Sequence, residues 1–397
     1  MDKTTDSFML PELNMQSKAG WLIWAAILIG AINLRTVMTS VSPLMPALID
    51  ELKASSIGVS FLYSIPILCM GLFSQISVWI IKKIHIEKAI SALLFIQGIS
   101  MIMRYYSPGY ITLIVSAIIS GVAIAALGPL ISGFVKKHLA HKATLGMSVF
   151  TFSIGLGAAL SASLSGWLYT SGTADWPFSL ATWGVLSILS AMFWLNIKSD
   201  NSNSQSPTNS DYTIPKKNIT VYFLVIFFAL QAGLTFSLMA WLTPLLVNKT
   251  NDYSLATYYF SLFSFLQLVG SLIFPPLLEK LGSKHGEYIS AGFVLLGVIS
   301  LSLPGNIPLG LLLTGVGCGA VFSYSLMMPL QLTKNYKECS AWSALMLGGG
   351  YTLSSLFPLG YAVLQDKGSD HPMIFLMLII QAASLLGVLV FLKRRIV

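Results

Sequence analysis

The chain alternates between long, continuously apolar segments and short polar ones. Each apolar segment has roughly the 20 residues that a helix needs to cross the hydrocarbon core of a bilayer. Apolar residues follow one another within these segments, without the alternation typical of the strands of a membrane β-barrel. The pattern predicts twelve transmembrane helices. They cover approximately residues 20–47, 56–81, 88–105, 110–136, 144–170, 177–197, 219–247, 254–278, 288–304, 307–333, 341–364 and 371–392.

Composition supports an all-α membrane protein. Hydrophobic residues make up 55% of the chain and charged residues only 10%, whereas roughly a quarter of an ordinary soluble domain is charged. The mean hydropathy is +0.76. A soluble chain of this size needs more charge to cover its surface. The composition therefore argues against a soluble enzyme, a nucleic-acid-binding protein and a disordered chain, and makes the lipid bilayer the expected surrounding.

Positive charges predict the orientation of the helices. With both termini placed in the cytoplasm, 18 of the 23 Lys and Arg residues fall on the inner side and 4 on the outer side. Basic residues accumulate on the cytoplasmic side of membrane proteins. We therefore interpret the net charge of +8 as a record of topology and not of nucleic-acid binding. The expected location is the plasma membrane, with multiple spans and both termini in the cytoplasm.

A polar segment divides the chain into two halves. Residues 198–218 are rich in Ser and Asn, which is typical of a flexible linker. This linker is expected on the cytoplasmic side, between an N-terminal six-helix bundle (1–197) and a C-terminal six-helix bundle (219–397). Short sequences recur in both halves, such as SPL at 42–44 and TPL at 243–245. They indicate two pseudo-symmetric bundles with a site at their interface.

Arg35 is the one charged residue that the pattern places deep in the membrane. The first predicted helix begins near Trp21, and fourteen residues at a rise of 1.5 Å carry Arg35 roughly 21 Å inward. An arginine there costs at least about 2.5–3.5 kcal/mol on insertion scales. No carboxylate falls at matching depth in the predicted helices. Arg35 either pins the first helix to its neighbours or holds an anionic or polar substrate in a central cavity, for which its planar fork of donors is suited.

Other side chains within the predicted helices are candidates for lining the same cavity. They are Tyr63, Gln231, Trp241, Gln267 and Tyr351. Each can instead be a contact between helices. Arg104, at the outer end of the third predicted helix, is expected to extend into water, with a minority interpretation that it attracts anions at the outer opening.

The sequence shows no motif for catalysis or ATP hydrolysis. The patterns H-E-x-x-H, G-x-S-x-G and Walker A do not occur, and no His, Cys and carboxylate cluster falls within the predicted helices. We therefore expect a protein that is not an enzyme, holds no metal or cofactor, and takes a small-molecule substrate as its partner. Any active transport must then use ion or solute gradients.

Several sequences resemble one known family. Residues 33–44 read NLRTVMTSVSPL, residues 66–73 read PILCMGLF, Gln231 is followed by Trp241, and residues 350–351 read GY. These are similar to the motifs N-L-R-P-x-x-T-S-V-x-P, P-x-L-C-x-G-L-F, Q…W-L-P and G-Y…P…G of the cyanate and 2-nitroimidazole transporter family of the major facilitator superfamily. The resemblance implies the major facilitator fold and a secondary transporter for small anions or small polar organic molecules.

The sequence departs from that family on helices expected to face the cavity. Thr36 stands in place of a proline, and Phe236 with Ser237 stands where a tyrosine is common. These departures bear on the substrate and not on the fold. The leading hypothesis is transport of a small anion by alternating access, with Arg35 as the central ligand, in a monomer. The alternatives are an efflux permease for neutral or amphipathic compounds, in which Arg35 is structural, and a membrane receptor that transports nothing.

Overall fold

The computed structural model describes residues 18–394 except 82, 108, 140–141, 174, 198–218, 281–284, 333–335 and 367–370. Throughout these residues the regular structure is helical. The helices are α1 (Lys18–Thr39), the 3₁₀ helix η1 (Ser42–Leu44), α2 (Met45–Leu52), α3 (Ser56–Phe73), α4 (Ile76–Ile81), α5 (Ile86–Tyr106), α6 (Tyr110–His138), α7 (Ala143–Thr170), α8 (Trp176–Leu195), α9 (Ile219–Thr250), α10 (Tyr253–Leu272), α11 (Phe274–Lys280), α12 (Gly286–Ser302), α13 (Ile307–Leu332), α14 (Tyr336–Ser354), α15 (Leu356–Asp366) and α16 (His371–Arg394). The prediction of an all-α protein is confirmed.

Every predicted membrane span corresponds to helical structure. Among the described residues, ten helices are long and apolar enough to cross a membrane, and α12 is a shorter apolar helix. The eleventh predicted span is divided into α14 and α15. The linker expected at 198–218 lies outside the described residues.

Two of the spans are interrupted one turn before a proline. The helix α1 ends at Thr39, four residues before Pro43, and α14 ends at Ser354, four residues before Pro358. A proline in a helix has no N–H to give to the carbonyl four residues earlier, and its ring collides with that carbonyl. The serines at the second break satisfy carbonyls themselves, since the Ser354 hydroxyl donates to the carbonyl of Tyr351. The first break leads into η1 and α2.

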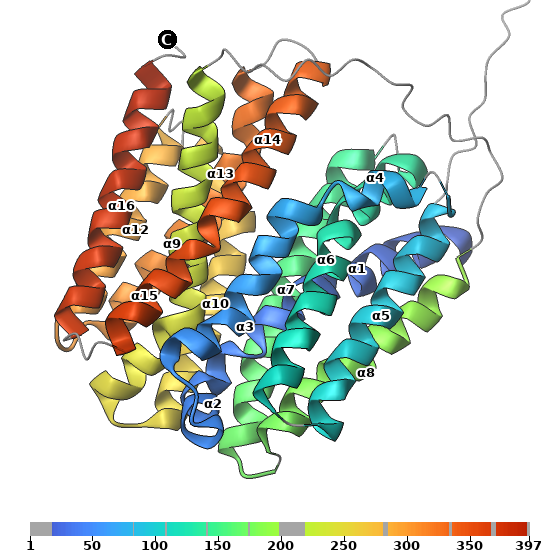
Figure 1. The fold of residues 1–397 in the computed structure, drawn as a ribbon. Helices are drawn as coiled ribbons and strands as arrows, with labels where there is room; N and C mark the ends of the chain where they lie inside the picture. Colours follow the sequence, from blue (N-terminus) through green and yellow to red (C-terminus); the bar gives the residue numbers. More distant parts are fainter. Residues whose placement is uncertain are drawn as a thin grey trace, which may run out of the picture.

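The helices pack in two groups that repeat the same pairing. In the first half, α3 contacts α6, α5 contacts α6 and α8, and α1 contacts α7. In the second half the corresponding contacts are α10 with α13, α12 with α13 and α16, and α9 with α14. Figure 1 shows the two groups as separate bundles, one with the blue to green helices and one with the yellow to red helices. The prediction of two pseudo-symmetric bundles agrees with this arrangement.

The two bundles meet along two helix pairs. The helix α7 packs along α10, and α3 packs along α14 and α15. Glycines permit this approach, because a Cβ on Gly71 would collide with Thr352 and one on Gly166 would collide with Thr257 of the other bundle. The ribbons diverge toward the end that carries the C-terminus (Figure 1). At the opposite end the bundles are joined by hydrogen bonds, including those from the backbone N–H groups of Ser56 and Ile57 to the Asp366 carboxylate.

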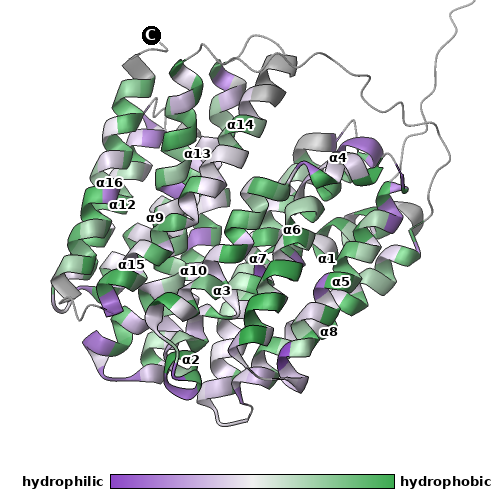
Figure 2. Cartoon of the chain, in the orientation of Figure 1, coloured by the Kyte–Doolittle hydropathy of each residue, from purple (hydrophilic) through white to green (hydrophobic). Residues whose placement is uncertain are grey.

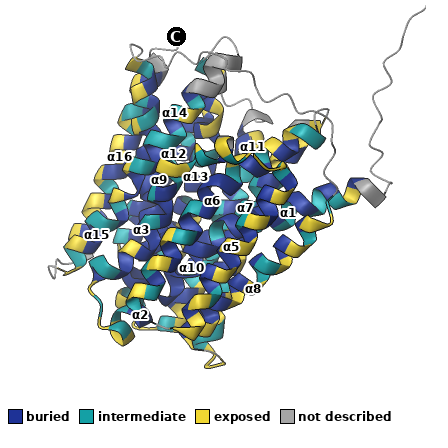
Figure 3. Ribbon diagram, turned by 45° about the vertical axis from the view of Figure 1, so that its right-hand side comes forward, coloured by how far each residue is buried: buried dark blue, intermediate teal, exposed yellow. Residues whose placement is uncertain are grey.

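The outer surface of the bundles is apolar, as a bilayer requires. Large side chains such as Leu189, Leu296 and Ile380 are more than half exposed. Figure 2 shows hydrophobic residues along the helices and hydrophilic residues mainly near the helix ends. Figure 3 shows the buried residues in the interior, between and within the bundles. The apolar helices and apolar outer surface are consistent with a multi-pass membrane protein.

Candidate functional site

Packing of α1 against its neighbours fixes the position of Arg35. A Cβ on Gly157 of α7 would collide with the carbonyl oxygen of Ile32, so these two helices lie in close contact. The Asn33 side-chain amide donates to the Ser190 hydroxyl of α8 at 2.9 Å. The carbonyl of Asn33 accepts a hydrogen bond of 2.8 Å from the Gln97 side chain of α5. Three helices of the first bundle thus contact the backbone and side chains directly before Arg35.

Arg35 borders a cavity at the interface of the two bundles. The helices α1 and α7 of the first bundle and α9, α10 and α13 of the second contribute its walls. The space open to the centres of water-sized molecules is about 50 Å³. The lining residues are Arg35, Thr151, Ile154, Gly155, Ala158, Thr235, Met239, Gln267, Leu268, Ser271, Gly319 and Phe322. Within this lining Arg35 is the charged residue, and the remaining polar side chains are hydroxyls and one amide.

The guanidinium of Arg35 has a hydrogen-bond donor that no protein group accepts from. Its Nη1 atom is buried and has no hydrogen-bond partner. Its Cζ atom lies 4.8 Å from the centre of the Phe236 ring. The carboxylate of Glu87 contacts Lys137 at 2.8 Å and His138 at 3.3 Å, away from Arg35. An uncompensated buried donor is costly, so an acceptor supplied by a substrate would be favoured there.

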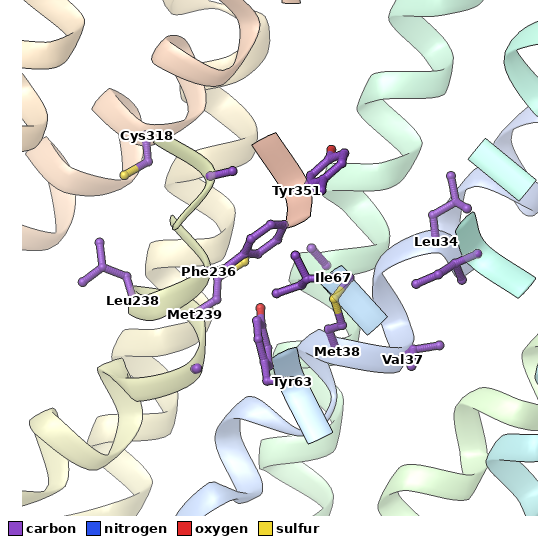
Figure 4. Packing of buried hydrophobic residues seen from close by; sticks show 14 of the residues in the cluster. Leu34, Val37, Met38, Tyr63, Ile67, Phe236, Leu238, Met239, Cys318 and Tyr351 are labelled. Atoms are coloured by element: carbon purple, nitrogen blue, oxygen red, sulfur yellow. The ribbon is translucent and has the colours of Figure 1, made fainter. Parts of the chain in front are cut away.

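Three aromatic rings meet beside Arg35, at the junction of the bundles. Phe236 of α9 lies 6.3 Å from the ring of Tyr63 on α3 and 6.2 Å from the ring of Tyr351 on α14. Tyr351 in turn packs edge-on against Phe228 at 5.0 Å. Figure 4 shows Phe236 between Tyr63 and Tyr351, with Met38 and Ile67 on the side of the first bundle. Tyr63 and Tyr351 therefore adjoin the residues around Arg35 without lining the cavity itself.

The two predicted glutamines lie at different distances from the cavity. Gln267 is one of the lining residues. Gln231 is buried one turn from the lining residue Thr235, to whose hydroxyl its amide donates at 3.3 Å. The side-chain oxygen of Gln231 is buried without a partner. Gln231 can thus orient the Thr235 hydroxyl.

Trp241 lies away from the cavity and has a structural contact. It is buried, and its indole N–H donates to the carbonyl of Pro358 on α15 at 3.0 Å. The same carbonyl accepts a hydrogen bond of 3.0 Å from the Ser60 hydroxyl of α3. This contact joins α9, α15 and α3 where the two bundles meet. The structure thus does not bring Trp241 together with Arg35 and Gln267.

The prediction that Arg104 extends into water is wrong. The residue is only 1% exposed. Its Nε donates to the Ser116 hydroxyl of α6 at 2.7 Å, and Arg104 therefore points into the first bundle. Its side chain follows the face of α5 that packs on α6. The position of Arg104 along the predicted helix indicates that it is near the outer end. It does not indicate which face of the helix carries the side chain.

Phe236 and the hydroxyls of the cavity were not among the predicted site residues. Thr235 lies four residues after Gln231, so both side chains occupy one face of α9. This spacing in the sequence could have indicated that Thr235 lies near the cavity. Phe236 was visible in the sequence only as a departure from a family motif. Among the described residues, no group of three or more His, Cys, Asp and Glu side chains is placed to hold a metal ion. What the arrangement offers is a cation, hydroxyls and an amide in an otherwise apolar chamber.

Comparison with known proteins agrees with this architecture. Residues 24–328 match the family model described as Major Facilitator Superfamily. The uncharacterized transporter YycB of Bacillus subtilis (strain 168) is 26% identical over 372 residues, which cover 92% of each chain. The cyanate transport protein CynX of Escherichia coli (strain K12) is 22% identical and covers 89% of this chain and 92% of its own.

Further relatives extend the comparison to solved structures. The 2-nitroimidazole transporter of Escherichia coli (strain K12) is 21% identical, over 88% of this chain and 90% of its own. The crystal structure of the nucleoside transporter NupG superposes with a TM-score of 0.75 at 14% identity, over 95% of this chain and 99% of that one. That of the D-xylose-proton symporter gives 0.68 at 15% identity, over 92% and 96%. The resemblance seen in the sequence is confirmed, and the chain is a membrane transporter that belongs to the major facilitator superfamily.

Proposed function

We propose that this protein is a secondary transporter of a small monovalent anion, which binds to Arg35 between the bundles. Two observations of Arg35 carry the proposal: its side chain lines the cavity, and its Nη1 is buried without a hydrogen-bond partner, with no described carboxylate paired to it. Guanidinium groups bind planar oxyanions and carboxylates through parallel N–H donors. Thr235 and Gln267 provide neutral hydrogen-bonding groups that fix the orientation of the anion.

The way the bundles meet supports alternating access. We infer that the halves 1–197 and 219–397 rock as two bodies joined by the linker 198–218. Hydrogen bonds such as those to Asp366 hold the bundles together at one end, while their ribbons diverge at the other (Figure 1). With the distribution of Lys and Arg, we assign the diverging end to the cytoplasm. The protein then sits in the plasma membrane as a monomer with both termini inside.

The relatives support this substrate class. Cyanate, which the name of one relative specifies, is a three-atom anion, and a cavity with one uncompensated cation suits a single negative charge. The cavity lining contains no carboxylate or histidine among the described residues. We therefore propose facilitated movement or exchange of the anion in preference to symport through a proton-binding carboxylate of the protein.

The experiment is uptake by the full chain in proteoliposomes loaded with unlabelled anion. Radiolabelled cyanate, formate and nitrate are the probes. Arg35→Ala and Arg35→Lys should reduce uptake about tenfold or more, because a hydrogen bond to a charged group contributes about 1.5–3 kcal/mol and lysine lacks the fork. The matched control is Lys83→Ala, which removes an exposed cation that contacts the Trp79 ring and should retain uptake. Unchanged uptake in Arg35→Ala would contradict the proposal.

A second candidate function is efflux of neutral or amphipathic compounds. It is favoured by the apolar part of the cavity lining, which includes Ile154, Met239, Leu268 and Phe322, and by the name of the 2-nitroimidazole relative. In this case Arg35 would be a structural residue. Uptake of neutral 2-nitroimidazole that survives Arg35→Ala, together with no uptake of any of the three anions by the unchanged protein, would favour this second function.

A further inference from the structure

The Phe236 ring restricts the directions from which a ligand can reach Arg35. The N–H donors of a guanidinium lie in its plane, whereas its faces attract π systems. The Cζ atom of Arg35 is 4.8 Å from the Phe236 ring centre. Phe236 is not a lining residue of the cavity. The ring therefore covers Arg35 on a side other than the one that the cavity reaches, and an anion must approach from the cavity.

The Phe236 ring is held firmly by residues from both bundles. It is only 1% exposed. Tyr63 contacts it edge-on at 63° from the first bundle, and Tyr351 contacts it at 38° from the second. Aromatic pairs at such spacings contribute beyond the area that they bury. Figure 4 shows the three rings in this order. A substrate would have to separate this packing to use the space that Phe236 occupies.

The remaining cavity is small. Its volume of about 50 Å³ for the centres of water-sized molecules corresponds to roughly three to five waters, since one water needs about 10–15 Å³ by this measure. An anion of three or four non-hydrogen atoms fills such a space. The ring of a benzoate, attached to the same carboxylate, does not fit within it and must extend through the open side or displace a wall.

We infer that Phe236 is a specificity-determining residue that limits the substrate to small planar anions. This inference rests on the proposed binding of an anion by Arg35, and it adds which substrates that site excludes and why. Replacement of Phe236 by a smaller aliphatic side chain frees the covered side of Arg35 and opens space toward Tyr63 and Tyr351. The substitution leaves the guanidinium of Arg35 unchanged. It should therefore alter which sizes of anion bind and not the preference for anions over neutral compounds.

The test compares formate with benzoate in the full-length protein. Equilibrium binding is measured by calorimetry in detergent, and exchange is measured in proteoliposomes, for the unchanged protein and for Phe236→Leu. We expect the unchanged protein to prefer formate. In Phe236→Leu the ratio of benzoate to formate affinity should rise about tenfold or more, as a change of one or two methylene-sized volumes produces in a binding site. Phe227→Leu is the matched control, because Phe227 is fully buried on the same helix and has no ring contact with Arg35.

The outcomes separate this inference from the proposed function. One outcome overturns the role of Phe236 but leaves the proposed function intact. In it, formate binding requires Arg35, and the ratio of benzoate to formate affinity is the same in Phe236→Leu and in the unchanged protein. An equal rise of that ratio in Phe227→Leu also overturns it, since the effect would then come from loosened packing. If the unchanged protein binds neither anion, the proposed function fails and the size selection fails with it. If Phe236→Leu does not fold, the same measurements are made on Phe236→Met, which removes the ring and retains an apolar side chain.

Discussion

Arg35 and Trp241 each have a buried polar atom, and the two atoms differ in whether the protein provides a hydrogen-bond partner. The Nη1 of Arg35 is without a partner, so the protein leaves this donor unused. The N–H of Trp241 is satisfied by the Pro358 carbonyl, so it is committed to the fold. A polar group already bonded within the protein must give up that bond before it can bind a ligand. At the scale of residues, the availability of a hydrogen bond separates the candidate ligand from the anchor.

Trp241→Phe should lower stability without weakening the binding of an anion. The change removes a hydrogen bond that contributes about 0.5–1.5 kcal/mol and leaves a small cavity. Thermal unfolding of the purified protein measures the first effect and calorimetry with formate the second. Affinity should stay within about threefold of the unchanged protein. A tenfold loss of affinity at unaltered stability would instead place Trp241 in the binding site, as the sequence had indicated.

Several hydrogen bonds join the two bundles, and one group of them lies at the start of α3. The Asp366 carboxylate accepts from the backbone N–H groups of Ser56 at 2.8 Å and Ile57 at 3.1 Å. A carboxylate at a helix N-terminus satisfies free donors and the helix dipole. Since α15 belongs to the second bundle and α3 to the first, this contact must break when that end opens. It is therefore a latch between two elements.

The latch should depend on pH in acid. Burial by itself would raise the pKa of Asp366, but the hydrogen bonds from Ser56 and Ile57 outweigh it and hold the pKa below its ordinary value. Because the pKa is lowered in the latched state, the stabilisation is complete above the ordinary carboxyl range and is lost as pH falls through the lowered pKa. We expect no change from pH 5 to pH 8 and opening of this end below about pH 4.

Asp366→Asn should open this end at neutral pH and remove the acid dependence. The exposed position limits the effect to about 0.3–1 kcal/mol, or up to about fivefold in population. Spin labels at Ser107 and Tyr258, which are exposed on different bundles, would report the separation by electron resonance. A separation that changes between pH 5 and pH 8 in the unchanged protein would show that another group controls this end.

At the scale of the whole molecule, charge is concentrated near the helix ends, where Glu87 and Arg104 are themselves buried. Hydrophilic residues gather near the helix ends in Figure 2. Within the described residues, the cavity lining contains Arg35 and no carboxylate or histidine. Under the proposed function, the protein would carry the charge of the anion across the membrane without a compensating proton on these lining side chains. Its transport should therefore respond to membrane potential.

Net uptake of a monovalent anion should follow an imposed potential and not an imposed pH gradient. Each elementary charge gains about 2.3 kcal/mol per 100 mV. Proteoliposomes with an inside-positive potassium diffusion potential should accumulate formate-sized anions, and the opposite potential should expel them. Nitrate is the preferred probe because it stays ionised over the usable pH range. Uptake of nitrate driven by a pH gradient at zero potential would reveal a proton site that the sequence and the structure do not indicate.

The sequence determined the number and place of the apolar helices, because burial in lipid demands about 20 apolar residues regardless of their neighbours. It also singled out Arg35, since a lone charge at membrane depth is conspicuous without any coordinates. Tertiary structure decided which prolines interrupt a helix. Pro43 and Pro358 follow breaks, whereas Pro244 lies inside the continuous helix α9. The local rule for proline is the same at all three positions, so the neighbouring helices decide the result.

Tertiary structure also decided which face of each helix meets the cavity. Arg104 is buried within the first bundle, and Trp241 donates a hydrogen bond to α15 where the bundles meet. The Phe236 ring lies against the guanidinium of Arg35. In a membrane, both the lipid-facing and the buried sides of a helix are apolar, so the sequence carries little of the periodic contrast that reveals a buried face in soluble proteins. The rotation of each helix is then set by small residues and a few hydrogen bonds to distant segments, and these become apparent only when the helices are packed.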